Sequence, residues 1–179
     1  LNQTDNTQSA SNIVNDYLFV CANRYVLKQT KGANYSYWFT HVPSFAVWPG
    51  AAKSCQPVSA GGQGRVCHSF ELPYVFRNPV AVTTPATPNG LVPPGIAFKA
   101  NEQGVVNLLT DYWTSFAAND VPTSASAPAP WQRFRANGRR QIIDGTAGYT
   151  NDSQSNCPLW DSIGYDLGAT NFGLFLPKP

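Results

Sequence analysis

The chain has 179 residues, which is the size of one ordinary domain and too short for two cores of usual size. Only 12% of its residues are charged and its formal net charge is +2, a balance that argues against a basic clamp for nucleic acid. Because 42% of the residues are hydrophobic and 13% are aromatic, the chain can build a core, and wholesale disorder is excluded as well.

No stretch of these residues has the pattern of a membrane helix or of a signal peptide. A membrane helix needs about 20 uninterrupted apolar residues, and the longest candidate, residues 105–113, is broken by Asn107 and Asp111. We therefore expect a soluble chain. Because the chain has no methionine and starts at Leu1, we expect Leu1 to be a processed start, with the beginning of the parent protein missing.

The cysteines indicate disulfides rather than metal binding. They form an even set without a C-x-x-C pair and without histidines at zinc-finger spacing, so no metal and no cofactor is expected. The count alone leaves three pairings open. Three Asn-x-Ser/Thr sequons add to the prediction of a secreted glycoprotein with two disulfides, although each sequon by itself can arise by chance. The residues concerned are Cys21, Cys55, Cys67, Cys157, Asn2, Asn34 and Asn151.

The N-terminal half is predicted to contain one helix, one strand and long loops. Residues 1–12 are rich in Asn, Gln, Ser and Thr, which predicts a loop or a frayed end. Apolar residues at a spacing of three and four over 13–27 predict a buried helix. The aromatic run 35–40 predicts a strand that joins a larger sheet, because six residues cannot form a sheet alone. Residues 42–65 and 77–94, rich in proline and small residues, are predicted loops.

The C-terminal half holds the clearest predicted helix. Over 101–119 apolar residues recur at helical spacing, and Pro122 follows as a stop signal. Residues 121–130 predict a linker, 141–145 a short strand, and 158–166 a short helix. Two short strands cannot satisfy the hydrogen bonds of their own edges, so these elements predict part of a larger α/β domain.

Acid–base chemistry by imidazole is limited to two residues, His41 and His68. His41 follows the predicted strand and is interpreted as a turn or core residue. His68 lies directly after Cys67, at the end of a glycine-rich loop and three residues before Glu71. Catalytic residues are often carried by such loops, so His68 is the stronger candidate.

Several short motifs follow one another in the order and spacing of a known family. They are Tyr-Ser-Tyr-Trp-Phe-Thr-His at 35–41, Trp-Pro at 48–49, Val-Cys-His-Ser-Phe-Glu-Leu-Pro-Tyr-Val-Phe at 66–76, Tyr-Trp-Thr-Ser-Phe-Ala at 112–117, Asn-Asp-Val-Pro at 119–122, Trp131, Ile-Ile-Asp at 142–144 and Cys-Pro-Leu-Trp at 157–160. Each motif alone is weak. The collinear set, from about Asn15 to Trp160, resembles the C-terminal third of the type-B carboxylesterase/lipase family, which includes the cholinesterases.

The resemblance implies an α/β-hydrolase fold. Residues 1–179 would form the C-terminal part of one such domain, with 1–12 as a loop and 15–179 following the family pattern, and a companion N-terminal polypeptide would complete the sheet. His68 is implied as the base of a Ser-Glu/Asp-His triad, which takes the proton from the serine and returns it to the leaving alcohol. The family commonly has glycine after this histidine, where Ser69 stands here, and Glu71 is usually structural and not the triad acid.

The other parts of such a triad are not found in these residues. No G-x-S-x-G elbow is present, and the cluster of Gly61, Gly62 and Gly64 lies just before His68, so it is interpreted as loop flexibility. The family places the serine, the oxyanion hole and the acid upstream. The expected partner is therefore a companion chain of the same precursor that carries the serine and the acid, and the expected substrate is a carboxylic ester.

The resemblance also implies how the cysteines pair. Cys21 aligns with a family cysteine that pairs near the C-terminus, where Cys157 stands, so Cys55 is left to pair with Cys67 and to close the loop before His68. A free Cys67 that acts as a nucleophile beside His68 is the alternative. It is disfavoured because the side chains of adjacent residues in a strand point to opposite sides.

Two sets of aromatic residues are assigned from their positions. Those at core spacing are expected to pack inside, and they are Trp38, Trp113, Phe116 and Trp160. Those close to the expected base are candidates for lining an acyl or alcohol pocket, with simple packing as the alternative, and they are Phe45, Trp48, Phe70 and Tyr74.

The combined prediction is a secreted serine esterase seen through its C-terminal polypeptide. This polypeptide would be inactive alone. A non-catalytic, cholinesterase-like adhesion or binding protein is the alternative, which the presence of His68 in an otherwise good motif disfavours. A self-sufficient binding module held by two disulfides is a third interpretation, and the low strand count argues against it.

Overall fold

The chain divides into two compact units. In a computed structural model, the described residues are 6–48, 52–79, 97–127, 130–134, 138–144, 148–151 and 156–165. The central unit is Ala33–Asn151, and the terminal unit combines Leu1–Gly32 with Asp152–Pro179. Within the described ranges, no helix is long and apolar enough to cross a membrane.

The central unit is built on a three-stranded sheet in the order β1-β2-β3. Strand β1 (Tyr37–Phe39) pairs in parallel with β2 (Arg139–Ile143), and β2 pairs antiparallel with β3 (Gly148–Asn151). The strands predicted at 35–40 and 141–145 are confirmed. β3 was not predicted, because its four residues begin with glycine and show no apolar alternation. Parallel neighbours need a long crossover that usually contains a helix, which is the α/β arrangement that the sequence indicates.

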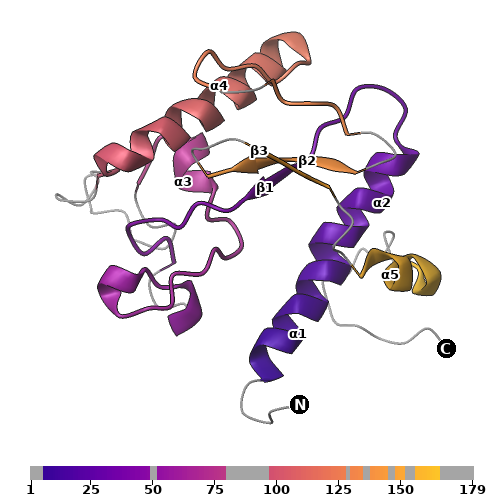
Figure 1. The fold of residues 1–179 in the computed structure, drawn as a ribbon, viewed down its shortest axis with the longest axis horizontal. Coiled ribbons are helices and arrows are strands. Elements are labelled where there is room, and N and C mark those ends of the chain that lie inside the picture. Colours follow the sequence, from indigo (N-terminus) through magenta and orange to yellow (C-terminus); the bar gives the residue numbers. More distant parts are fainter. Residues whose placement is uncertain are drawn as a thin grey trace, which may run out of the picture. The chain divides into compact units, whose positions relative to one another are not determined.

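Helix α4 (Gln103–Asn119) lies across one face of this sheet (Figure 1). A turn of 3-10 helix, η4 (Ala100–Glu102), precedes it, and Asp120 ends it in the left-handed conformation with φ 58°. The predicted helix at 101–119 is therefore confirmed. Its buried side chains pack with those of the sheet and of the short helix α3 (Leu72–Val75) in one cluster, which includes Phe39, Tyr74, Val105, Leu109, Tyr112 and Ile143.

Side chains of β1 point alternately to the two faces of the sheet. Tyr37 and Phe39 face α4, whereas Trp38 is 46% exposed and lies under the guanidinium of Arg140, 5.3 Å from the ring centre. The expectation that Trp38 packs in the core is therefore wrong, and Phe116 is exposed as well. Trp113 packs against the core as expected.

The predicted loop at 42–65 contains two single turns of 3-10 helix, η2 (Lys53–Cys55) and η3 (Val58–Ala60). After η3 the chain turns back, and the backbone N–H groups of Gln63, Gly64 and Arg65 donate to carbonyls between Lys53 and Gln56. A Cβ on Gly62 would lie 2.0 Å from the carbonyl oxygen of Gln56. Glycine is thus required here for close packing of the loop on itself, and not for flexibility. Of the predicted loop at 77–94, residues 80–94 lie outside the described residues.

The described residues of the terminal unit form one long helical segment and a short helix beside it (Figure 1). The long segment comprises α1 (Asn6–Asn15), one π-helical turn, η1 (Asp16–Val20), and α2 (Cys21–Gln29). The loop predicted for 1–12 is therefore wrong from Asn6 onward. Its polar residues extend a helix whose apolar pattern starts later, and Gln8 donates to Asn12 one turn further on at 2.7 Å.

The long segment is helical as predicted over 13–27, but it is not buried in the described residues. Only Cys21 and Ala22 of α2 are buried, where the segment meets α5 (Cys157–Ile163). The large apolar side chains left exposed in this unit are Ile13, Val14, Leu18, Phe19, Tyr25, Val26, Leu159 and Ile163. The helical spacing identified an apolar face correctly, but spacing does not tell what covers that face.

A disulfide between Cys21 and Cys157 joins the long segment to α5. Around it, Arg24 forms a 2.7 Å ion pair with Asp161, and the ring of Trp160 lies 5.3 Å from that of Tyr17. The helix predicted at 158–166 is confirmed up to Ile163. The terminal unit is thus a helix pair held by one covalent and several polar contacts.

Candidate active site

His68 lies in the turn that leads into α3, and the residue is exposed. Its backbone is held on both sides. Cys67 is bonded to Cys55, and the indole N–H of Trp48 donates to the carbonyl oxygen of His68 at 3.0 Å. On the other side Phe70 is buried in the core. His68 therefore lies at the surface, while its backbone is held by contacts of the neighbouring residues with the interior.

Both disulfides have the pairing that the family resemblance implied, Cys21 with Cys157 and Cys55 with Cys67. Cys67 is consequently not a free thiol, which rules out its interpretation as a nucleophile beside His68. The two bridges differ in exposure. Cys21 and Cys157 are fully buried, whereas Cys55 and Cys67 are only partly buried.

Ser69, directly after His68, has a backbone conformation that suits glycine. Its φ is 67°, in the left-handed region that side chains with a Cβ disfavour. This conformation turns the chain from the disulfide loop into α3, where the N–H of Leu72 donates to the carbonyl of Ser69. Serine thus occupies a position whose backbone suits glycine.

Ser69→Gly is expected to raise the free energy of unfolding by about 1 kcal/mol. The replacement relieves the strain of the left-handed backbone, and this gain outweighs the greater conformational entropy that glycine gives the unfolded chain. Chemical denaturation measures the change. Ser59→Gly is the matched control: Ser59 lies in η3 with a negative φ, so the same replacement is expected to destabilise the protein there. Equal destabilisation by both replacements would contradict this interpretation of Ser69.

Glu71 is held from the sheet. The hydroxyl of Tyr37 in β1 donates to its Oε1 at 3.4 Å. Burial of Tyr37 and the nearby charge of Glu71 both raise the pKa of the tyrosine, which keeps it a donor. Glu71 therefore ties the residues after His68 to β1.

Glu102 accepts hydrogen bonds from several segments of the central unit, and only 1% of it is exposed. It accepts hydrogen bonds from the backbone N–H and hydroxyl of Ser44 at 2.9 and 2.7 Å, from the Tyr74 hydroxyl at 2.7 Å and from the Lys99 N–H at 2.8 Å. The carboxylate thus joins the loop after β1, helix α3 and the start of α4. Sequence analysis did not single out Glu102, because an acidic residue near a helix start is usually exposed.

The hydrogen bonds decide the charge of Glu102. Burial by itself raises the pKa of the carboxyl, but the bonds from Ser44, Tyr74 and Lys99 outweigh it and lower the pKa from 4.5 to about 2. Burial and the same carboxylate raise the pKa of Tyr74. Glu102 is therefore a buried carboxylate that organises its neighbours.

His41 belongs to this carboxylate cluster. Its Nε2 lies 3.4 Å from Oε1 of Glu102, its side chain is largely buried, and its ring lies edge-on to Tyr74 at 5.3 Å. The interpretation of His41 as a core residue at a turn is supported.

The four aromatic candidates for pocket lining hold the surroundings of His68 together. Phe70 and Tyr74 are buried in the core, Phe45 stacks on Tyr74 with ring centres 6.2 Å apart, and Trp48 binds the His68 carbonyl. Whether they also contact a substrate stays a prediction.

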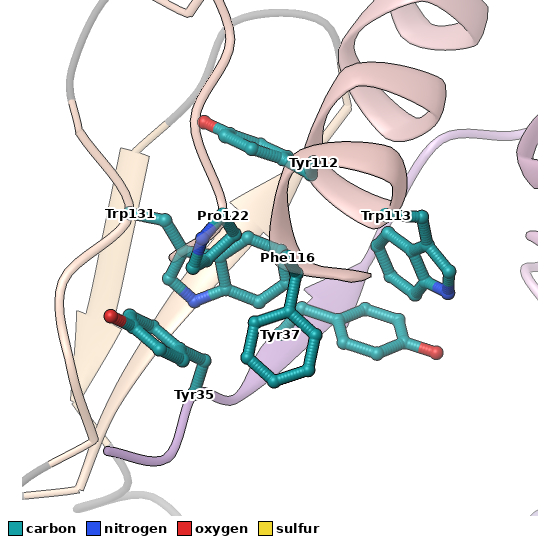
Figure 2. Close-up of a pocket in the computed structure, with 7 residues that line it drawn as sticks. All are labelled: Tyr35, Tyr37, Tyr112, Trp113, Phe116, Pro122 and Trp131. Atoms are coloured by element: carbon teal, nitrogen blue, oxygen red, sulfur yellow. The ribbon is translucent and has the colours of Figure 1, made fainter. Parts of the chain in front are cut away.

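An aromatic hollow of about 220 Å³ lies elsewhere in the central unit, between β1, α4 and the segment around Trp131 (Figure 2). Sequence analysis did not predict it, although the spacing of Tyr35 with Tyr37 and of Trp113 with Phe116 places each pair on one face of its element. Its lining residues are Tyr35, Tyr37, Tyr112, Trp113, Phe116, Pro122 and Trp131. Aromatic rings make up most of this lining, so the hollow offers mainly apolar contacts.

Comparison with known proteins identifies the family. The described part of the chain is a mixed α/β structure with an exposed histidine in the turn before α3, and the carboxylesterase family matches residues 1–159. The chain belongs to the carboxylesterase family. The family implies an α/β-hydrolase fold, of which the three strands and the covering helix of the central unit are a part.

Solved structures with similarity include the carboxylesterase EST55 of Geobacillus stearothermophilus, determined at pH 6.2 and at pH 6.8. The sequence identities are 18% and 21%, and the TM-scores 0.37 and 0.38. The alignments cover 55% and 52% of this chain but only 18% and 19% of the esterase. No curated protein gives a significant sequence match. The matched region is thus less than one fifth of the length of that esterase.

Proposed function

We propose that this chain is the C-terminal part of a secreted serine carboxylesterase and that His68 is its triad base. The observation that carries the proposal is the setting of His68, which is exposed in a turn whose backbone is fixed by a disulfide, by Trp48 and by the buried Phe70. A catalytic base needs this combination of a fixed backbone and an accessible ring. The family match over residues 1–159 supports the reaction class.

In the proposed reaction, the nucleophilic serine and the triad acid belong to a companion N-terminal part of the same precursor. His68 takes the proton of the serine hydroxyl as the serine oxygen attacks the ester carbonyl, and the imidazolium then gives this proton to the departing alcohol. Water, deprotonated by the same imidazole, attacks the acyl-enzyme in the second half of the reaction. The carboxylic acid leaves and the proton returns to the serine oxygen.

The proposed location outside the cell rests on the two disulfides, which persist in oxidising compartments. Glycosylation is part of the same proposal. Asn34 lies partly buried in the central unit and its sequon is intact, the side chain of Asn151 is not among those described, and Asn2 lies outside the described residues. The substrate is proposed at the level of a carboxylic ester.

The test is to label the native protein with a fluorophosphonate, which reacts only with an activated serine, and to map the label after denaturing, non-reducing mass analysis. We expect a larger polypeptide to accompany residues 1–179 and to carry the label on a serine outside them. If the native protein consists of this chain alone, is folded and takes no label, the esterase proposal fails and a non-catalytic binding role becomes the better account.

A further inference from the structure

The loop between Cys55 and Cys67 is connected to His68 by two routes. The first is covalent, because Cys67 precedes His68 and is bonded to Cys55. The second runs through hydrogen bonds: the amide of Gln56 donates to the carbonyl of Trp48 at 3.1 Å, and the indole of Trp48 donates to the carbonyl of His68 at 3.0 Å. The loop therefore holds the N-terminal side of the histidine.

The loop is compact enough to act as a support. The residues after η3 fold back on η2 and Gln56 through the backbone bonds of Gln63, Gly64 and Arg65, and Gly62 packs against the Gln56 carbonyl. Pro57 and Val47 are buried at its base. With the bridge closed, Cys67 is attached to a compact loop. With the bridge open, this covalent attachment is lost.

The C-terminal side of His68 has its own anchors, which do not depend on the bridge. Phe70 is buried, Glu71 accepts from Tyr37, and Tyr74 donates to Glu102. Opening the bridge would thus release one side of the histidine while the core and α3 stay in place. Such a release changes the position of the ring without unfolding the unit.

The bridge is also the one that a reductant reaches first. Cys55 and Cys67 are partly exposed, whereas Cys21 and Cys157 are 0% exposed. Thiol–disulfide exchange requires access of a thiolate to a sulfur atom, so the native protein should lose the Cys55–Cys67 bridge before the other.

We propose that the Cys55–Cys67 disulfide is a positioning element for His68 and that its reduction lowers esterase activity reversibly. This inference rests on the proposed function. In the reduction, one thiolate of a dithiol attacks a sulfur of the bridge and forms a mixed disulfide while the other cysteine leaves as a thiolate. The second thiol of the reductant then displaces the first cysteine, so two electrons pass to the protein, two cysteine thiols form and the dithiol becomes a cyclic disulfide.

The experiment treats the native protein, with its companion polypeptide, with increasing dithiothreitol in the absence of denaturant. Alkylation and mass analysis report which cysteines are free, and ester hydrolysis is measured at each step. We expect kcat to fall about ten- to a hundredfold in step with the opening of Cys55–Cys67, with KM changed less than about twofold, and to return on reoxidation. Near-ultraviolet circular dichroism monitors the fold.

A double variant, Cys55→Ser with Cys67→Ser, provides the matched control. It is expected to have the low kcat of the reduced protein and to be insensitive to dithiothreitol. Unchanged kcat after selective opening of the bridge would overturn the inference, and so would loss of the folded state on opening, since the bridge would then be a global support. Failure of the proposed function is recognised separately, because the oxidised protein would then hydrolyse no ester, or His68→Gln would leave its activity intact.

Discussion

Replacing His68 with glutamine in the intact protein is expected to lower kcat/KM for carboxylic ester hydrolysis by at least about 10⁴-fold. Glutamine fills a similar volume but cannot take a proton from the serine at neutral pH, so the attack on the ester carbonyl loses its base. The fold should persist, because His68 is an exposed residue, and neither the hydrogen bond from Trp48 to its carbonyl nor the bridge at Cys67 involves the ring. Steady-state kinetics with a chromogenic ester measure the change.

The matched control is the same replacement at the other histidine. His41 lies beside Glu102, where the amide of glutamine can still donate, so His41→Gln is expected to change kcat/KM by less than about tenfold. An equal loss in both variants would point to general damage of the central unit. A His68→Gln protein that is folded and fully active would contradict the assignment of the base.

The second large effect is expected at Glu102. Glu102→Ala should lower the free energy of unfolding by about 3–5 kcal/mol, because it leaves the donors of Ser44, Lys99 and the fully buried Tyr74 without their acceptor. Chemical denaturation measures the loss. Glu71→Ala is the control, since Glu71 is only partly buried and accepts one long hydrogen bond, and it should cost about 1 kcal/mol or less.

The same carboxylate makes stability depend on pH. Its pKa is about 2 in the folded protein and 4.5 ordinarily, so its stabilisation is complete above pH 4.5 and is lost as the pH falls toward 2. The lost part amounts to about 3 kcal/mol. The free energy of unfolding, measured between pH 5 and pH 2, should therefore fall less steeply in Glu102→Gln than in the wild type. An identical slope in both proteins would show that the hydrogen bonds do not stabilise the charge.

The elements that could be predicted from sequence are those that carry their own periodic signal. Helix α4 places Val105, Leu108, Leu109 and Tyr112 on one buried face, and β1 is recognised from consecutive aromatic residues. Helix α1 was missed because its polar residues carry no such signal.

Only part of the candidate site could be predicted from sequence, for a similar reason. His68 and the disulfide pairs follow from a resemblance in linear sequence, which the family match supports. The left-handed backbone at Ser69 and the cluster around Glu102 depend on contacts between distant segments, such as Ser44, Tyr74 and Lys99. No local pattern brings those residues together, so only the folded structure identifies them.

The most direct measurement for the central claim is the rate at which a fluorophosphonate inactivates the native protein, compared between wild type and His68→Gln. Phosphonylation needs a serine oxygen whose proton is removed by a base, so it tests the pair without any assumption about the natural ester. The account predicts rapid labelling of a serine outside residues 1–179 in the wild type and at least about a thousandfold slower labelling in His68→Gln. Equal labelling rates in the two proteins would show that another group activates the serine and would contradict the account.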